Sequence, residues 1–233
     1  MSVSSETKKK RRKTNRVDEL ALPSLFETVE TDDLLSGLKT AIGRSKSSYL
    51  DAYGAMVSSA KKLAHSGDAD AFVAVAYMAY GWMPTILDTF GPKTTEPDGR
   101  NWQEIIEKLQ NAGQTGFKAR SLNDADHLID RLDDRSLVNG SWVGFSKFLH
   151  FINPECFPIW DSRVAMHWAA EQPAHWHNSK WAYRAYLKFC FAELETEAVS
   201  AVKSVLDAPE ISDMRALELA LFLLKPDGTP QNS

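Results

Sequence analysis

A lysine and an aspartate in the middle of this 233-residue chain have the chemistry of an amine nucleophile and an assisting carboxylate. Lys147 lies in a strongly apolar run at 143–152, and Asp161 follows fourteen positions later. Burial among apolar side chains disfavours the charged ammonium, so a larger share of the amine is uncharged and nucleophilic. A carboxylate held nearby stabilises developing positive charge and accepts a proton. Taken singly, each residue also has a structural explanation, because aspartate is a favoured helix N-cap and most helical lysines are solvated.

Two successive helices are expected to position this pair. The first spans 141–152, follows a glycine-containing turn, carries Lys147 and is stopped by an Asn-Pro pair. The second spans 160–171 and has Asp161 near its start, where a carboxylate lies in the positive field of the helix. The sequence therefore predicts a lysine-bearing helix, a short loop, and an aspartate at the beginning of the next helix.

The stretch 139–169 resembles the catalytic core of the helix-hairpin-helix/Gly-Pro-Asp DNA glycosylase superfamily, in particular its 8-oxoguanine glycosylase-like branch. Members carry a Gly-Val-Gly-Thr-Lys element, an apolar helix, and Val-Pro-Val-Asp before the next helix. The matching segments here are Val-Gly-Phe-Ser-Lys at 143–147 and Phe-Pro-Ile-Trp-Asp at 157–161. The chain has a shorter loop, lacks the family's Leu-Pro-Gly-Val-Gly hairpin sequence, and has Arg163 where His or Asn is common. These differences indicate a divergent branch.

The resemblance implies a DNA glycosylase with an AP-lyase step, acting on double-stranded DNA that contains a damaged or modified base. Lys147 would attack the anomeric carbon and form a Schiff base, and Asp161 would stabilise the oxocarbenium-like sugar. This chemistry needs no metal ion and no cofactor. The base stays open between an oxidised purine such as 8-oxoguanine and a hypermodified base of invading phage DNA. The protein is expected to act as a monomer, in base-excision repair or in defence against phage.

A base flipped out of the duplex is held by aromatic faces and hydrogen-bonding groups. Trp160 directly precedes Asp161, and His150 lies one helical turn from Lys147. Trp82 is a third candidate for the base pocket. Each of the three has an alternative explanation as a side chain of the helical core.

The N-terminal stretch 1–16 holds seven basic side chains and one acidic side chain, whereas the remaining 217 residues hold 20 basic and 30 acidic ones. Such a charge run has no apolar face to bury, so residues 1–17 are expected to form a disordered tail that contacts the phosphate backbone. A nuclear-import signal and a solubilising tail have the same composition. Further phosphate contacts are expected from the amides of Gly140 and Gly144 and from Arg163. The candidate tail contacts are Lys8, Lys9, Lys10, Arg11, Arg12 and Lys13.

The rest of the chain has the apolar spacing of helices and lacks the alternating pattern of β-strands joined by hairpin turns. We expect a compact, orthogonal all-α domain over 18–225, with a helix-hairpin-helix-like element at 139–169 and a loose C-terminus at 226–233. Nine helices are expected, at 33–42, 46–65, 69–80, 101–112, 122–133, 141–152, 160–171, 178–205 and 212–224.

Composition and motifs exclude several classes of protein. Two cysteines, Cys156 and Cys190, form neither a disulfide scaffold nor a four-cysteine zinc site. The sequence has no phosphate-binding loop, no dinucleotide fingerprint, no HExxH motif and no apolar run of the ~20 residues that span a membrane. A cytoplasmic, nucleoid-associated location is expected, or a nuclear one in a eukaryote. Two other classes stay open: a catalytically inert helical DNA-binding module, and a helical interaction protein whose acidic body binds a basic partner.

Overall fold

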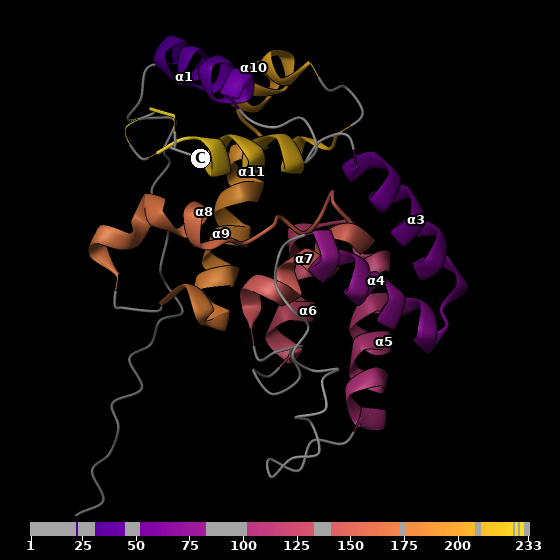
Figure 1. Cartoon of the computed structure of the whole chain (residues 1–233). Helices are drawn as coiled ribbons and strands as arrows, with labels where there is room; N and C mark the ends of the chain where they lie inside the picture. Colours follow the sequence, from indigo (N-terminus) through magenta and orange to yellow (C-terminus); the bar gives the residue numbers. More distant parts are fainter. Residues whose placement is uncertain are drawn as a thin grey trace, which may run out of the picture.

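The protein is all-helical over the residues that its computed structural model describes, which are 22, 31–44, 52–82, 102–132, 141–172, 176–207, 211–225, 227 and 229–230. In these residues the chain forms ten α-helices and two short 3-10 helices (Figure 1). The same residues contain no β-strand, and their extended contact is a single antiparallel bridge between Leu224 and Pro230. The expectation of an all-α fold is confirmed.

Helices follow one another closely along the chain. Their bounds are α1 Thr31–Arg44, α3 Tyr53–Ser66, α4 Ala69–Trp82, α5 Trp102–Lys118, α6 Leu122–Arg131, α7 Trp142–Ile152, α8 Ser162–Ala165, the 3-10 helices η5 Met166–Glu171 and η6 Trp176–Asn178, then α9 Lys180–Glu193, α10 Glu197–Leu206 and α11 Asp213–Leu223.

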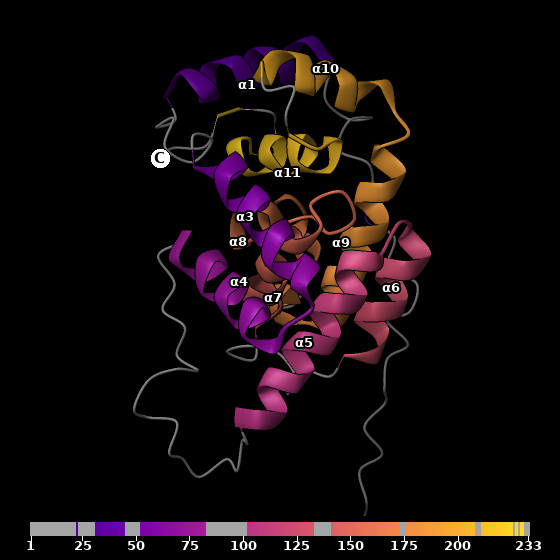
Figure 2. The ribbon, with the colours of Figure 1, turned by 90° about the vertical axis from the view of Figure 1, so that its right-hand side faces the viewer.

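The helices pack in two groups around a central helix. At one end of the molecule α1 and α10 lie side by side, and both contact α11 (Figures 1 and 2). Helices α3, α4 and α5 pack against each other at the other end and contact α7, and α6 packs on α5 and α9. Helix α7 is therefore surrounded, which places the expected lysine-bearing helix at the centre of the fold.

Several expected helix bounds are wrong. The helix expected at 178–205 is two helices, α9 and α10, with a turn at 194–196 between them. The helix expected at 160–171 begins at Ser162 and tightens into 3-10 geometry at Met166. Of the helix expected at 46–65, the described part begins at Tyr53, and residues 46–51 lie outside the described part.

Helix α5 continues six residues beyond its expected end at 112, through two glycines. A Cβ atom added at Gly113 would lie 2.2 Å from the ring of Phe72, and one at Gly116 would lie 3.1 Å from Leu149. The glycines therefore let α4 and α7 approach α5 closely, and this packing offsets the low helix propensity of glycine.

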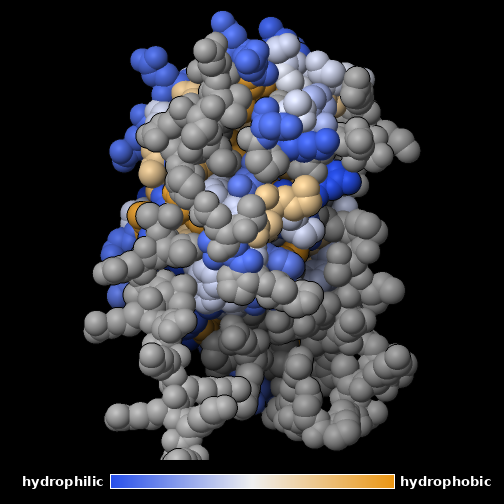
Figure 3. Space-filling model, turned by 90° about the vertical axis from the view of Figure 1, so that its left-hand side faces the viewer, coloured by the Kyte–Doolittle hydropathy of each residue, from blue (hydrophilic) through white to orange (hydrophobic). Residues whose placement is uncertain are grey.

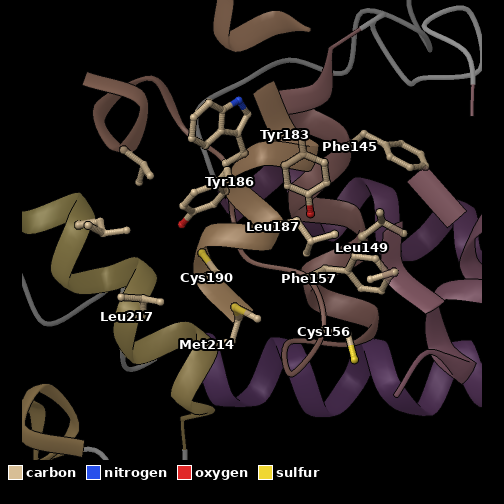
Figure 4. Close-up of a cluster of buried hydrophobic side chains, with 14 of the residues drawn as sticks. Phe145, Leu149, Cys156, Phe157, Tyr183, Tyr186, Leu187, Cys190, Met214 and Leu217 are labelled. Carbon is tan, nitrogen blue, oxygen red and sulfur yellow. The ribbon is translucent and has the colours of Figure 1, made fainter. Parts of the chain in front are cut away.

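One continuous apolar cluster runs from Leu22 to Leu224 and includes both cysteines, which are free thiols. Figure 4 shows its centre, where Tyr183, Tyr186 and Cys190 extend along one side of α9. Ten of the eleven residues of α7 are buried, so this helix lies inside the core, with mainly apolar side chains around it. The boundaries expected at residues 17 and 225 stay predictions.

On the face that Figure 3 shows, the visible described surface is mostly polar, with small apolar patches. Among the described residues, the most exposed large apolar side chains are those of Tyr77 and Met166. None of the described helices has the length and apolar character needed to cross a membrane. The basic tail at 1–17 lies outside the described residues.

Candidate active site

Lys147 lies in the middle of α7, and its side chain is only 6% exposed. Ser141 caps the start of the helix, and its hydroxyl accepts a hydrogen bond from the Gly144 amide. Burial lowers the pKa of the Lys147 amine below its usual value, and the carboxylate of Asp161 opposes this shift. The expected desolvation of this lysine is therefore present in the structure.

Asp161 is the N-cap of α8, and its two carboxylate oxygens have different partners. The Oδ1 atom accepts a hydrogen bond from the Arg163 amide at 3.0 Å, which caps the helix. The Oδ2 atom lies 3.6 Å from Nζ of Lys147, and the aspartate side chain is 15% exposed. The structure thus brings together the lysine and aspartate that the sequence singled out.

The geometry of this pair permits two kinds of chemistry. A distance of 3.6 Å is within reach of an ion pair but longer than a strong charge-assisted hydrogen bond. Because Oδ2 is not saturated by a short contact to the amine, it can stabilise a developing positive charge beside Lys147 or accept its proton. The low exposure of both groups strengthens their electrostatic interaction relative to that in water.

Trp160 is fully buried, so it presents no open face on which a flipped base could stack. Its indole N–H donates to the backbone oxygen of His177 at 2.7 Å, and its rings pack against Tyr186, Trp176 and Trp168. The structure therefore places Trp160 in the core next to the pair, where it anchors the chain that carries Asp161. The structure does not test the assignment of Trp160 to the base pocket, which stays a prediction.

His150 is also fully buried, and both ring nitrogens are engaged. Nδ1 lies 2.7 Å from the carbonyl oxygen of Phe157, and Nε2 lies 2.7 Å from the hydroxyl of Tyr53. A carbonyl only accepts, so Nδ1 carries the proton and Tyr53 donates to Nε2. Burial lowers the pKa of His150 to about 3, so the ring is neutral. His150 thus ties α7 to α3 and to the loop that follows α7. Its assignment to the base pocket stays a prediction.

Trp82, the last residue of α4, is partly buried away from the pair. Its ring meets Phe151 edge-on with centroids 5.4 Å apart, and the guanidinium of Arg215 lies 5.3 Å from its centroid. These contacts make Trp82 part of an aromatic and cationic cluster with Tyr53. Its assignment to the base pocket stays a prediction.

Gly144 serves close helix packing. A Cβ atom there would lie 2.0 Å from the hydroxyl oxygen of Tyr80, so any larger residue would collide with that side chain. Its amide already donates to Ser141, and the residue is buried, so the predicted phosphate contact at Gly144 is not supported. Gly140 lies outside the described residues.

Arg163 is half-buried in the first turn of α8, and its guanidinium lies 5.0 Å from the centroid of the Phe222 ring. A cation–π contact uses the face of the guanidinium, so its N–H groups can still donate hydrogen bonds to a phosphate. The Arg163 amide bonds to Asp161, whereas its guanidinium lies over Phe222, and the expected phosphate contact of Arg163 stays a prediction. The tail residues Lys8 to Lys13 lie outside the described part.

Sequence reasoning missed a buried ion pair between Arg215 and Glu218 on α11. The side chains of both residues are almost completely buried, and the arginine guanidinium lies 4.9 Å from the centroid of the Tyr53 ring. The signal was present in the sequence, because these two charges interrupt an otherwise apolar helix, Met-Arg-Ala-Leu-Glu-Leu-Ala-Leu, at 214–221. A charge in such a helix is buried and needs a partner.

Two surface clefts lie apart from the pair. The larger, about 710 Å³, is bounded by α3, the 154–155 turn and the start of α11, and it has Lys61 and Glu155 on its walls. The smaller, about 320 Å³, lies between α5 and α6. Within the described ranges, no group of three or more His, Cys, Asp or Glu side chains is arranged to hold a metal ion.

Comparison with known proteins gives no further assignment: no protein-family model matches the chain, and no curated protein or solved structure is significantly similar to it.

Proposed function

We propose that this protein is a DNA glycosylase with AP-lyase activity that excises a damaged or modified base from double-stranded DNA. The observation that carries the proposal is the buried amine of Lys147 at 3.6 Å from the carboxylate of Asp161. The resemblance of 139–169 to the helix-hairpin-helix glycosylases and the basic tail support it. The base, and a role in repair or in defence against phage, stay open between the alternatives given above.

The proposed reaction begins when the base leaves the duplex and its sugar reaches the pair. The uncharged amine of Lys147 attacks the anomeric carbon, the glycosidic bond breaks, and its electron pair leaves with the base, which takes up a proton. Asp161 stabilises the positive charge on the sugar and accepts the proton that the attached amine releases. The C1′–O4′ bond then breaks, O4′ takes up the proton held by Asp161, and the nitrogen lone pair forms the protonated Schiff base. A base, either the Asp161 carboxylate or water, removes a C2′ proton, and the C3′–O bond breaks with its electron pair leaving on the 3′ phosphate.

The test is a panel of duplexes, each with one modified base, scored for released base, strand nicking and covalent trapping by borohydride. Wild-type protein is expected to release at least one base and to become trapped on that duplex. Lys147→Ala should abolish trapping, and Asp161→Asn should abolish base release.

A matched control is Lys203→Ala. Lys203 also pairs with an aspartate, Asp213 at 2.7 Å, but these side chains are 31% and 60% exposed. This variant should keep both activities. Trapping that survives Lys147→Ala, or a wild-type protein inactive on the whole panel, would show that the buried pair is structural and would favour the inert DNA-binding module.

A further inference from the structure

Ser146 and Trp160 are hydrogen-bonded to each other, and each directly precedes one member of the candidate pair. The hydroxyl oxygen of Ser146 accepts a hydrogen bond from the Trp160 amide at 2.9 Å, and it lies 3.3 Å from the carbonyl oxygen of the same residue. The hydroxyl donates to the Val143 carbonyl at 2.9 Å. Ser146 is completely buried, so no water competes for these contacts.

This hydrogen bond joins a helix to a segment without regular secondary structure. Residues 157–161 run between α7 and α8 without regular secondary structure. The other anchor of Trp160 is its side chain, which donates to His177 and packs among aromatic rings. The backbone just before Asp161 is therefore held on one side by Ser146 and on the other by the buried indole.

We propose that Ser146 is a positioning residue that sets the distance between Lys147 and Asp161 by fixing the backbone of Trp160 against α7. The hydroxyl contacts neither the amine nor the carboxylate. It acts through the backbone of Trp160, the residue that directly precedes Asp161. Its effect on catalysis rests on the proposed function, whereas its effect on the Lys147–Asp161 distance does not. The two parts are therefore tested with separate measurements.

The variant is Ser146→Ala, which removes the hydroxyl at a buried position without adding atoms. In single-turnover reactions with saturating DNA, we expect base release and borohydride trapping to slow by about tenfold to a hundredfold, because small displacements of reacting groups have effects of this size. DNA affinity should change less than about twofold, since Ser146 is buried away from solvent. Where this variant does not fold, Ser146→Cys replaces it, because a thiol is nearly isosteric and a weak acceptor.

The second measurement needs no activity. In protein labelled with 13C at lysine Cε, the NMR titration midpoint of Lys147 reports how closely Asp161 approaches, because the carboxylate favours the charged amine. Ser146→Ala should move this midpoint downward, toward the value in Asp161→Asn. The control is Ser121→Ala, which removes the hydroxyl that caps α6 by accepting the Asp124 amide. It should leave the Lys147 midpoint unchanged.

A Lys147 midpoint in folded Ser146→Ala equal to that of wild type would overturn the proposal. So would unchanged single-turnover rates in an active protein. If wild type is inactive on every duplex but the midpoint moves as expected, the proposed function fails and the positioning role stands.

Discussion

The carboxylate of Asp161 caps α8 through Oδ1 and faces the amine of Lys147 through Oδ2. Because each oxygen has its own partner, the side chain has little freedom to rotate away from the lysine. The pair is assembled in the free protein before any ligand binds, which is the arrangement that favours electrostatic stabilisation of a transition state.

The first prediction concerns the pH dependence of imine formation. Burial lowers the pKa of Lys147 and Asp161 raises it, with burial the larger effect. Since only the unprotonated amine attacks, the trapping rate should rise with pH and level off at a midpoint below the usual lysine value. In Asp161→Asn, trapping on a duplex with a preformed abasic site, which needs no base release, should have a still lower midpoint. Rates from about pH 5 to 10 test this prediction, and a midpoint that rises in Asp161→Asn would contradict it.

The second prediction concerns acid stability. The pKa of His150 is lowered to about 3 in the folded protein, whereas an unfolded chain has its usual value near 6.5. Between these values the unfolded state binds more protons, so the free energy of unfolding should decrease as the pH falls through this window, by on the order of 1 kcal/mol per pH unit. Urea unfolding of wild type at pH 7 and pH 4.5 measures the loss.

His150→Gln has an amide that can both donate to the Phe157 carbonyl and accept from Tyr53, but it does not titrate. Its unfolding free energy should therefore vary less with pH over the same range. The control is exposed His65→Gln, which should retain the wild-type acid dependence. Equal slopes for His150→Gln and wild type would contradict the assignment.

The third prediction concerns the contact between α4 and α7. Gly144→Ala places a Cβ atom 2.0 Å from the hydroxyl oxygen of Tyr80, so the Tyr80 side chain or the two helices must shift, and we expect a loss of stability of about 1–3 kcal/mol. Tyr80→Phe removes the colliding oxygen, so the double variant should lose less than the sum of the single variants. The matched control is Gly54→Ala in α3, where a Cβ meets nothing within 4 Å. That change should be neutral or slightly stabilising.

The fourth prediction concerns the basic tail. Deletion of residues 1–16 removes seven basic side chains, so DNA binding should weaken at low salt. The slope of log affinity against log salt should become shallower by ~0.9 for each phosphate that the tail neutralises in the full-length protein. Base release at saturating DNA should be retained. Fluorescence anisotropy at several salt concentrations gives the slope, and an identical slope for the truncated protein would show that the tail does not bind DNA.

The sequence was most informative where a local rule decides the structure. The Asn-Pro stop after α7 and the aspartate N-cap of α8 place Lys147 and Asp161 on successive helices, and local rules find both signals. Ser146 carries no such signal, because its value depends on an amide fourteen residues away. The break between α9 and α10 was missed for a similar reason, since no glycine or proline marks 194–196.

The aromatic residues show the same limit. Trp160 and His150 were assigned to a pocket because they neighbour the pair in sequence or on the helix. Neighbours along a chain can face opposite sides. Trp160 packs against Tyr186 of α9, and His150 hydrogen-bonds to Tyr53 of α3, so these contacts determine where the two rings lie. Tertiary packing of this kind is set by residues far away in the sequence, so it could not be predicted from the local pattern.

The capping role of Asp161 has a thermodynamic consequence for regulation. Helix α8 is only four residues long, so its first turn depends on the bond from the Arg163 amide to Oδ1. Because one carboxylate makes both contacts, fraying of the first turn of α8 is expected to draw the carboxylate away from the lysine. A ligand that binds the ordered turn is then expected to stabilise the pair as well.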